Sequence, residues 1–127
     1  MTLEQSRISK ILVIKLRAIG DVLLSSVVLK NFREAFPGRQ IDFLTEKPCR
    51  EVVEGNPYLD DVLVFDGHRD SALALILMVR RRKYDLVLDL FGNPRSAILT
   101  YLSGAKYRVG YRFGWRRYCY NIVVEPR

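Results

Sequence analysis

The turn "RAIGD" holds three residues whose types could do chemistry, namely Arg17, Gly20 and Asp21. It separates an apolar run typical of a buried strand from a helical pattern. There the Asp21 carboxylate can act as a general base that takes a proton from a hydroxyl group. Gly20 lets the backbone pass close to a ligand, and Arg17 can bind a phosphate or a carboxylate. A plainer interpretation makes Asp21 a helix cap and Arg17 a solvated loop residue.

A second turn, "FGNPRS" at 91–96, has a similar composition. Asn93, Arg95 and Ser96 can direct polar groups at a ligand. In the plainer interpretation, Asn93 caps a helix that begins at Pro94, and Arg95 is solvated. The local sequence leaves both interpretations open. The position of the two turns in the fold therefore matters more than either turn alone.

Apolar runs of strand length alternate with helical patterns along the chain. We expect strands at 10–16, 40–45, 61–66, 84–90, 107–111 and 120–125. We expect helices at about 21–36, 47–55, 70–83 and 94–105, with Asp70 or Ser71 capping the third. This alternation predicts an α/β fold with a doubly wound, mostly parallel, Rossmann-like sheet. In such sheets ligands bind beyond the carboxyl ends of the strands, so both turns should lie at the ligand-binding edge.

The composition limits the function classes. A chain of 127 residues suits one domain, and no apolar run approaches the length of a membrane span. Cys49 and Cys119 are far apart and His68 is the only histidine, which argues against a disulfide, a metal site or a histidine-based triad. No secretory signal is visible, so we expect a cytoplasmic protein. The sequence has neither a G-x-G-x-x-G fingerprint nor a P-loop.

The net charge of +7 is unevenly distributed. One basic block is "RRRK" at 80–83, which we expect to be a solvated helix end away from the ligand-binding edge. Another extends from 106 to 127, where "YRVGYRFGWRRYCY" interleaves aromatic residues with arginines. Such a segment could stack on bases or sugars, or it could be a strand and loop with core aromatics. The charge favours anionic partners without selecting among nucleic acid, an acidic membrane face and a phosphorylated small molecule.

Two segments carry a resemblance to a known family. They are "ILVIKLRAIGDVLLSSVVLKNFREAFPGRQIDFLTE" and "YDLVLDLFGNPRSAILTYLSGAKYRVGYR". Together they resemble the N-terminal half of a family 9 glycosyltransferase, the family of the lipopolysaccharide heptosyltransferases. The resemblance implies a GT-B architecture, in which an N-terminal domain receives the Kdo-lipid A acceptor and a C-terminal domain holds ADP-heptose. It also implies that Asp21 is the base for an inverting, metal-independent transfer.

The resemblance further implies a set of acceptor-binding residues and a set of partners. The residues are Arg17, Gly20, Asn93, Arg95, Ser96, Arg112, Arg116 and Arg117. The partners would be an anionic glycolipid, a nucleotide-sugar donor and, peripherally, the cytoplasmic membrane face, with no nucleic acid and no further cofactor. The sequence departs from the family at "RAI", where family members often carry small hydroxyl residues. It also ends where a donor domain would follow, so we expect a single acceptor-side domain over 1–127 that transfers little alone.

Two other functions remain open on the residues alone. The first is a free-standing Rossmann-like nucleotide-binding or regulatory module, which the missing glycine fingerprint disfavours. The second is a basic nucleic-acid-binding domain, which predicts tight, strongly salt-dependent binding to random oligonucleotides.

Overall fold

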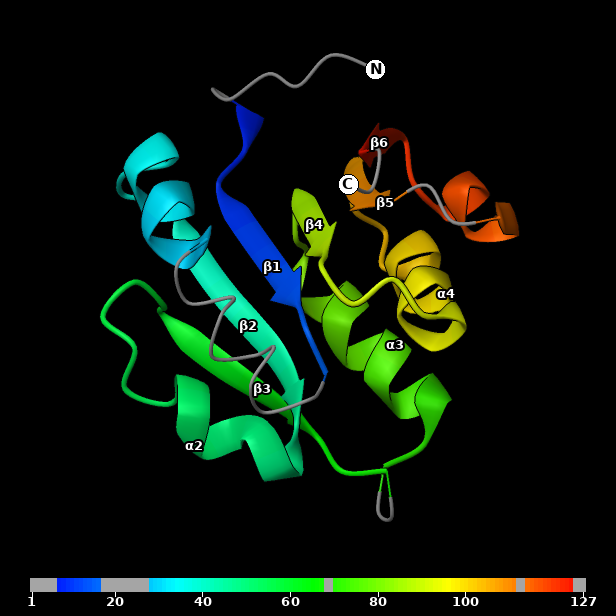
Figure 1. Ribbon diagram of the computed structural model, residues 1–127, viewed down its shortest axis with the longest axis horizontal. Coiled ribbons are helices and arrows are strands. Elements are labelled where there is room, and N and C mark those ends of the chain that lie inside the picture. The colour runs from blue at the N-terminus through cyan, green and yellow to red at the C-terminus, as the bar shows by residue number, and fades with distance from the viewer. Residues whose placement is uncertain (1–6, 17–27, 68–69, 112–113, 125–127) are drawn as a thin grey trace.

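The protein is built on one six-stranded parallel sheet (Figure 1). The computed structural model describes residues 7–16, 28–67, 70–111 and 114–124. The strand order is β3-β2-β1-β4-β5-β6, and every neighbouring pair is parallel. The strands are β1 (Lys10–Ile14), β2 (Gln40–Glu46), β3 (Asp61–Phe65), β4 (Leu86–Asp89), β5 (Tyr107–Tyr111) and β6 (Ile122–Val124). The predicted doubly wound, Rossmann-like α/β fold is therefore confirmed.

Helices cover both faces of this sheet. The helical residues 28–35 and α2 (Arg50–Val53), which follows the short 3-10 helix η2 (Lys47–Cys49), pack on one face. On the other lie α3 (Ala72–Arg82) and α4 (Pro94–Leu102). Along β1, Ile11 and Val13 point into the first core cluster, whereas Leu12 and Ile14 point into the second. Both faces of the strand are buried, which explains its continuous apolar run.

The helix ends differ in detail from those predicted. Of the two candidate caps for α3, Ser71 is the one that acts, because its side chain accepts a hydrogen bond from the backbone N–H of Ala74 at 3.1 Å. Several elements are shorter than predicted: β1 ends at Ile14 and α4 at Leu102, whereas β4 begins at Leu86 and β6 at Ile122. The 3-10 helix η3 (Gly114–Cys119) was not predicted at all.

The aromatic segment before β6 divides between the core and the surface. Tyr107 and Tyr120 are buried, whereas Tyr118 is 70% exposed. The interpretation of this segment as a strand and loop with core aromatics is thus confirmed for two of its tyrosines.

Candidate functional site

The turns after β1 and β4 leave the sheet as neighbours. The two strands pair directly, with Ile14 in register with Asp89. Beyond that pair, the Leu90 N–H donates to the Ile14 carbonyl at 2.9 Å, and the Leu16 carbonyl accepts from the Glu46 N–H at 3.0 Å. The chain therefore enters the turn "RAIGD" from the carboxyl edge of the sheet, between β2 and β4. Arg17, Gly20 and Asp21 themselves lie outside the described residues, so their roles stay predictions.

Asp89, at the end of β4, anchors the turn "FGNPRS" that follows this strand. Asp89 was not identified as a site residue from the sequence. Its side chain is fully buried. One carboxylate oxygen accepts the N–H groups of Phe91 at 3.0 Å and Gly92 at 2.9 Å, and the other accepts the Tyr120 hydroxyl at 2.6 Å. Burial raises the pKa of Asp89, although these hydrogen bonds favour the charged form. An aspartate followed by a glycine turn, as in "DLFG", was the signal that could have identified it.

Asn93 and Ser96 form a reciprocal cap at the start of α4. The Asn93 side chain accepts from the Ser96 N–H at 2.8 Å, while the Ser96 hydroxyl accepts from the Asn93 N–H at 3.1 Å. Pro94 occupies the first turn, as expected for a helix start. The predicted capping role of Asn93 is confirmed. Ser96 is fully buried, whereas Asn93 is partly exposed. Contact between an acceptor and either side chain stays a prediction.

Arg95 and Lys15 are among the described cations at this carboxyl edge. Arg95 is half exposed, with its guanidinium 3.9 Å from a Glu46 carboxylate oxygen and 5.8 Å from the centre of the Phe65 ring. Lys15, which sequence reasoning did not single out, donates its ammonium group to the Leu90 carbonyl at 3.3 Å and lies over the Phe91 ring. Both cations can attract a phosphate or a carboxylate to this edge.

The three remaining predicted arginines come from the segment around η3. Arg117 is half-buried and donates to the Tyr118 hydroxyl at 2.9 Å. Its helix packs against α4 through Cys119 and Ala97. Arg112 and the side chain of Arg116 lie outside the described residues. Their contribution to an acceptor site remains a prediction.

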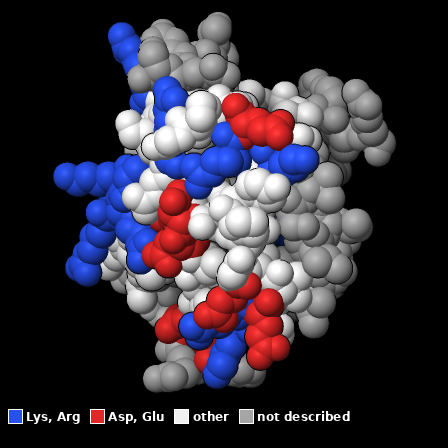
Figure 2. Space-filling view, turned by 90° about the vertical axis from the view of Figure 1, so that its left-hand side faces the viewer, with Lys and Arg blue, Asp and Glu red and all other residues white. Residues whose placement is uncertain are grey.

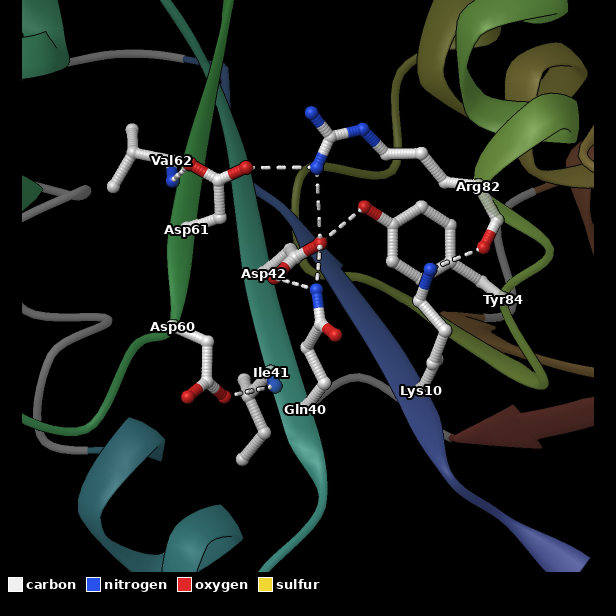
Figure 3. A network of polar contacts seen from close by, with 9 residues as sticks. All are labelled: Lys10, Gln40, Ile41, Asp42, Asp60, Asp61, Val62, Arg82 and Tyr84. Atoms are coloured by element: carbon white, nitrogen blue, oxygen red, sulfur yellow. Dashed lines mark hydrogen bonds and ion pairs between the residues drawn. The ribbon is translucent and has the colours of Figure 1, made fainter.

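The opposite, amino edge of the sheet carries a polar network of its own (Figure 3). Fully buried Asp42 accepts from the Tyr84 hydroxyl at 2.5 Å and pairs with Arg82 at 3.4 Å. Arg82 also pairs with Asp61 at 2.8 Å. Burial and the neighbouring Asp42 raise the pKa of Tyr84. The network joins the end of α3 to β2, β3 and β4, which gives it a structural role.

This network corrects one sequence prediction. The block "RRRK" does lie away from the carboxyl edge, but it is not uniformly solvated, because Arg82 turns back to the two aspartates. The local sequence could not reveal this pairing, because Arg82 ends α3 whereas Asp42 and Asp61 lie in β2 and β3.

Within residues 7–16, 28–67, 70–111 and 114–124, no group of three or more His, Cys, Asp or Glu side chains is arranged to hold a metal ion. In the same ranges, no helix combines the length and apolar character needed to cross a bilayer.

Several known proteins are similar to this chain in sequence and in fold. No protein-family model matches the chain. Lipopolysaccharide heptosyltransferase 1 of Campylobacter coli is 28% identical over 94 residues, covering 72% of this chain and 28% of that protein. Lipooligosaccharide heptosyltransferase 2 of Haemophilus ducreyi is 28% identical over 121 residues, covering 87% of this chain and 32% of that protein.

Solved structures agree with these sequence relatives. A glycosyl transferase of family 9 from Veillonella parvula superposes with a TM-score of 0.84 at 27% identity, over 98% of this chain and 37% of that one. The E. coli ADP-heptose heptosyltransferase II superposes with a TM-score of 0.78 over 90% of this chain and 34% of that one, and at 24% identity it supports the fold alone. By sequence and fold, the chain is a relative of the family 9 glycosyltransferases and spans about a third of the length of those heptosyltransferases.

Proposed function

We propose that this chain is the acceptor-side, N-terminal domain of a GT-B glycosyltransferase. The complete enzyme would transfer heptose, or a related sugar, from ADP-heptose to the lipopolysaccharide inner core. Relatives named as heptosyltransferases support this. The ADP-heptose donor is taken from a neighbour that shares the fold, E. coli WaaC, whose structure contains ADP-2-deoxy-2-fluoro heptose. The observation that carries the proposal is the register of Ile14 with Asp89, because it brings together the carboxyl ends of β1 and β4, where ligands bind in sheets of this kind.

Each group would have a distinct task. Asp21 would take the proton from the acceptor hydroxyl as that oxygen attacks the anomeric carbon of the donor and displaces ADP, with inversion and without a metal ion. Arg95 and Lys15 would hold carboxylates or phosphates of the acceptor, and Asp89 would keep the turn after β4 in shape. The nucleotide sugar would come from a second domain, so the chain alone would transfer little or nothing.

Acceptor binding can be tested on the chain itself by titration calorimetry with a soluble, Kdo-containing inner-core oligosaccharide. We expect binding that Arg95→Ala weakens about tenfold, the loss expected for one hydrogen-bonded charge. Arg50→Ala on α2 is the matched control, since Arg50 is as exposed as Arg95 (56% against 53%) and also pairs with a glutamate. Equal affinity in all three proteins, or no binding at all, would contradict the acceptor site.

The catalytic assignment needs a polypeptide that also contains a donor-binding domain. In that protein we expect Asp21→Asn to abolish heptose transfer while acceptor binding and the melting temperature change little. If transfer survived and only the melting temperature fell, Asp21 would be a helix cap. Binding of the chain to random oligonucleotides at physiological salt would favour a nucleic-acid-binding function instead.

A further inference from the structure

The outer surfaces of α3 and α4 expose large apolar side chains. Leu73 and Leu77 of α3 are 66% and 43% exposed, and Ile98 and Tyr101 of α4 are 44% and 56% exposed. The spacings of four and three residues place each pair on one helical face. These residues are additional to the buried ones, such as Leu75 and Val79, that hold α3 on the sheet. Helix α3 therefore has apolar side chains on its solvent-facing side as well as on the side that packs against the core.

The two apolar faces are parts of one surface. The helices lie side by side over the same face of the sheet (Figure 1). An apolar pocket of about 150 Å³ lies between them, lined among others by Leu75, Ile76, Ile98 and Leu99. At the other end of the helices, the Arg80 guanidinium donates to the Leu102 carbonyl at 2.7 Å. We call this surface, formed by the exposed residues of α3 and α4, the α3–α4 face.

The charged side chains of α3 and α4 themselves have a single sign. Neither helix contains an aspartate or a glutamate, as "ALALILMVRRR" and "PRSAILTYL" show. Arg80, Arg81 and Lys83 lie at one end, and Arg95 lies at the other. The surface at the β3 edge is different, because acidic and basic side chains are interspersed there (Figure 2), as in the pairs Arg33–Asp60 and Arg50–Glu54.

A basic pocket of about 310 Å³ adjoins the arginine-rich end. It lies between the ends of α3 and α4 and is lined by Arg80, Lys83 and Lys106, with Asp85 as its one acidic side chain. Its excess of positive charge suits a phosphate group. Apolar side chains and a basic pocket thus occur on adjoining parts of one surface.

We propose that the α3–α4 face binds the surface of an anionic lipid bilayer. The leucines, Ile98 and Tyr101 enter the interfacial region, while the cations contact lipid phosphates and the basic pocket holds one headgroup. A second copy of this chain would bring like charges together, so the charge favours an anionic bilayer over self-association. This inference extends the proposed function and rests on it for one point only. That point is the reason for bilayer binding, namely that the proposed acceptor is embedded in a membrane.

Vesicle flotation of the 127-residue chain tests this surface without any sugar. We expect binding to equimolar phosphatidylglycerol–phosphatidylcholine vesicles, little binding to phosphatidylcholine alone, and release at high salt. Leu73→Ser/Leu77→Ser should weaken binding about tenfold or more. Arg81→Gln should weaken it about fivefold, the effect of one cation at an anionic surface. All these side chains are exposed, so the melting temperature should not change.

Matched substitutions on the other side of the sheet complete the design. Val28→Ser has an exposure close to that of Leu77→Ser, at 37% against 43%, and Arg50→Gln removes an exposed arginine from α2. Both should leave vesicle binding unchanged. Absence of binding to the anionic vesicles would overturn the proposal, and so would equal loss in the test and control variants. A change of oligomeric state in Leu73→Ser/Leu77→Ser without loss of vesicle binding would assign the face to self-association.

The oligosaccharide titration separates this proposal from the proposed function. Vesicle binding without oligosaccharide binding would refute the acceptor site alone. Oligosaccharide binding without vesicle binding would refute the α3–α4 face alone.

Discussion

The Tyr120 hydroxyl donates a hydrogen bond of 2.6 Å to the Asp89 carboxylate, and both side chains are buried. Asp89 in turn accepts the first N–H groups of the turn after β4. A residue 31 positions further along the chain therefore supports the turn that presents Arg95 at the carboxyl edge. Gly110 of β5 leaves room for this contact, because a Cβ atom there would lie 2.4 Å from the Tyr120 ring.

We predict that Gly110→Ala displaces the Tyr120 ring and weakens its hydrogen bond to Asp89. The expected loss in the free energy of unfolding is about 1–3 kcal/mol, typical of overpacking in a core. Gly67→Ala is the matched control, because its Cβ atom would have its nearest contact at 3.8 Å. Urea denaturation measures both variants. Equal stability of the two would mean that Tyr120 can move without cost.

We predict that Asp89→Asn changes how stability depends on pH. Burial raises the pKa of Asp89 above the ordinary value of 3.8, so the folded chain holds the proton more tightly than the unfolded chain. The stability that this proton contributes is complete below pH 3.8 and is lost as the pH rises through the folded-state pKa. Because asparagine cannot ionise, the Asp89→Asn protein does not lose this stability as the pH rises.

Chemical denaturation of both proteins from acid to neutral pH checks this prediction. The stability of Asp89→Asn relative to the parent should increase as the pH rises. Because other carboxylates titrate equally in both proteins, the difference between them isolates Asp89. A difference that stayed constant over the whole range would contradict the raised pKa.

We predict that Tyr84→Phe destabilises the fold by about 1–3 kcal/mol, since buried Asp42 loses a hydrogen-bond donor. Tyr118→Phe removes the same hydroxyl from a side chain that is 70% exposed, so it should change stability by less than about 0.5 kcal/mol. Thermal or urea unfolding compares the two. Oligosaccharide binding should be intact in folded Tyr84→Phe, because the network lies at the edge opposite the candidate site.

We predict that substitutions of Asn93 separate its capping role from contact with an acceptor. Asn93→Ala should lower the free energy of unfolding by about 0.5–2 kcal/mol, as expected for a lost N-cap. Asn93→Asp keeps the cap and should leave stability nearly unchanged. If Asn93 also faces an anionic acceptor, the added charge in Asn93→Asp should weaken oligosaccharide binding in calorimetry. Unchanged binding in Asn93→Asp would leave capping as its role.

The sequence was sufficient for features that depend on neighbouring residues. Continuous apolar runs predicted the parallel strands, because both faces of each central strand are covered. Ser71, as one of two candidates, and Asn93 could be proposed as caps, since a cap bonds to a backbone N–H only three residues away. The alternation of strands and helices then predicted the fold class, and the fold class predicted which edge binds ligands.

The sequence could not reveal which distant side chains meet. Asp89 and Tyr120 are 31 positions apart, and Asp42 and Tyr84 are 42 apart. Their contacts depend on strand order and on the path of the crossovers, which no local pattern encodes. Sequence alone therefore predicted the strands and the main helices, gave candidate caps, and led us to expect ligands at the carboxyl edge. Only the tertiary structure decided that Asp89 supports the turn, that Arg82 is paired, and that α3 and α4 expose one apolar face bordered by positive charge.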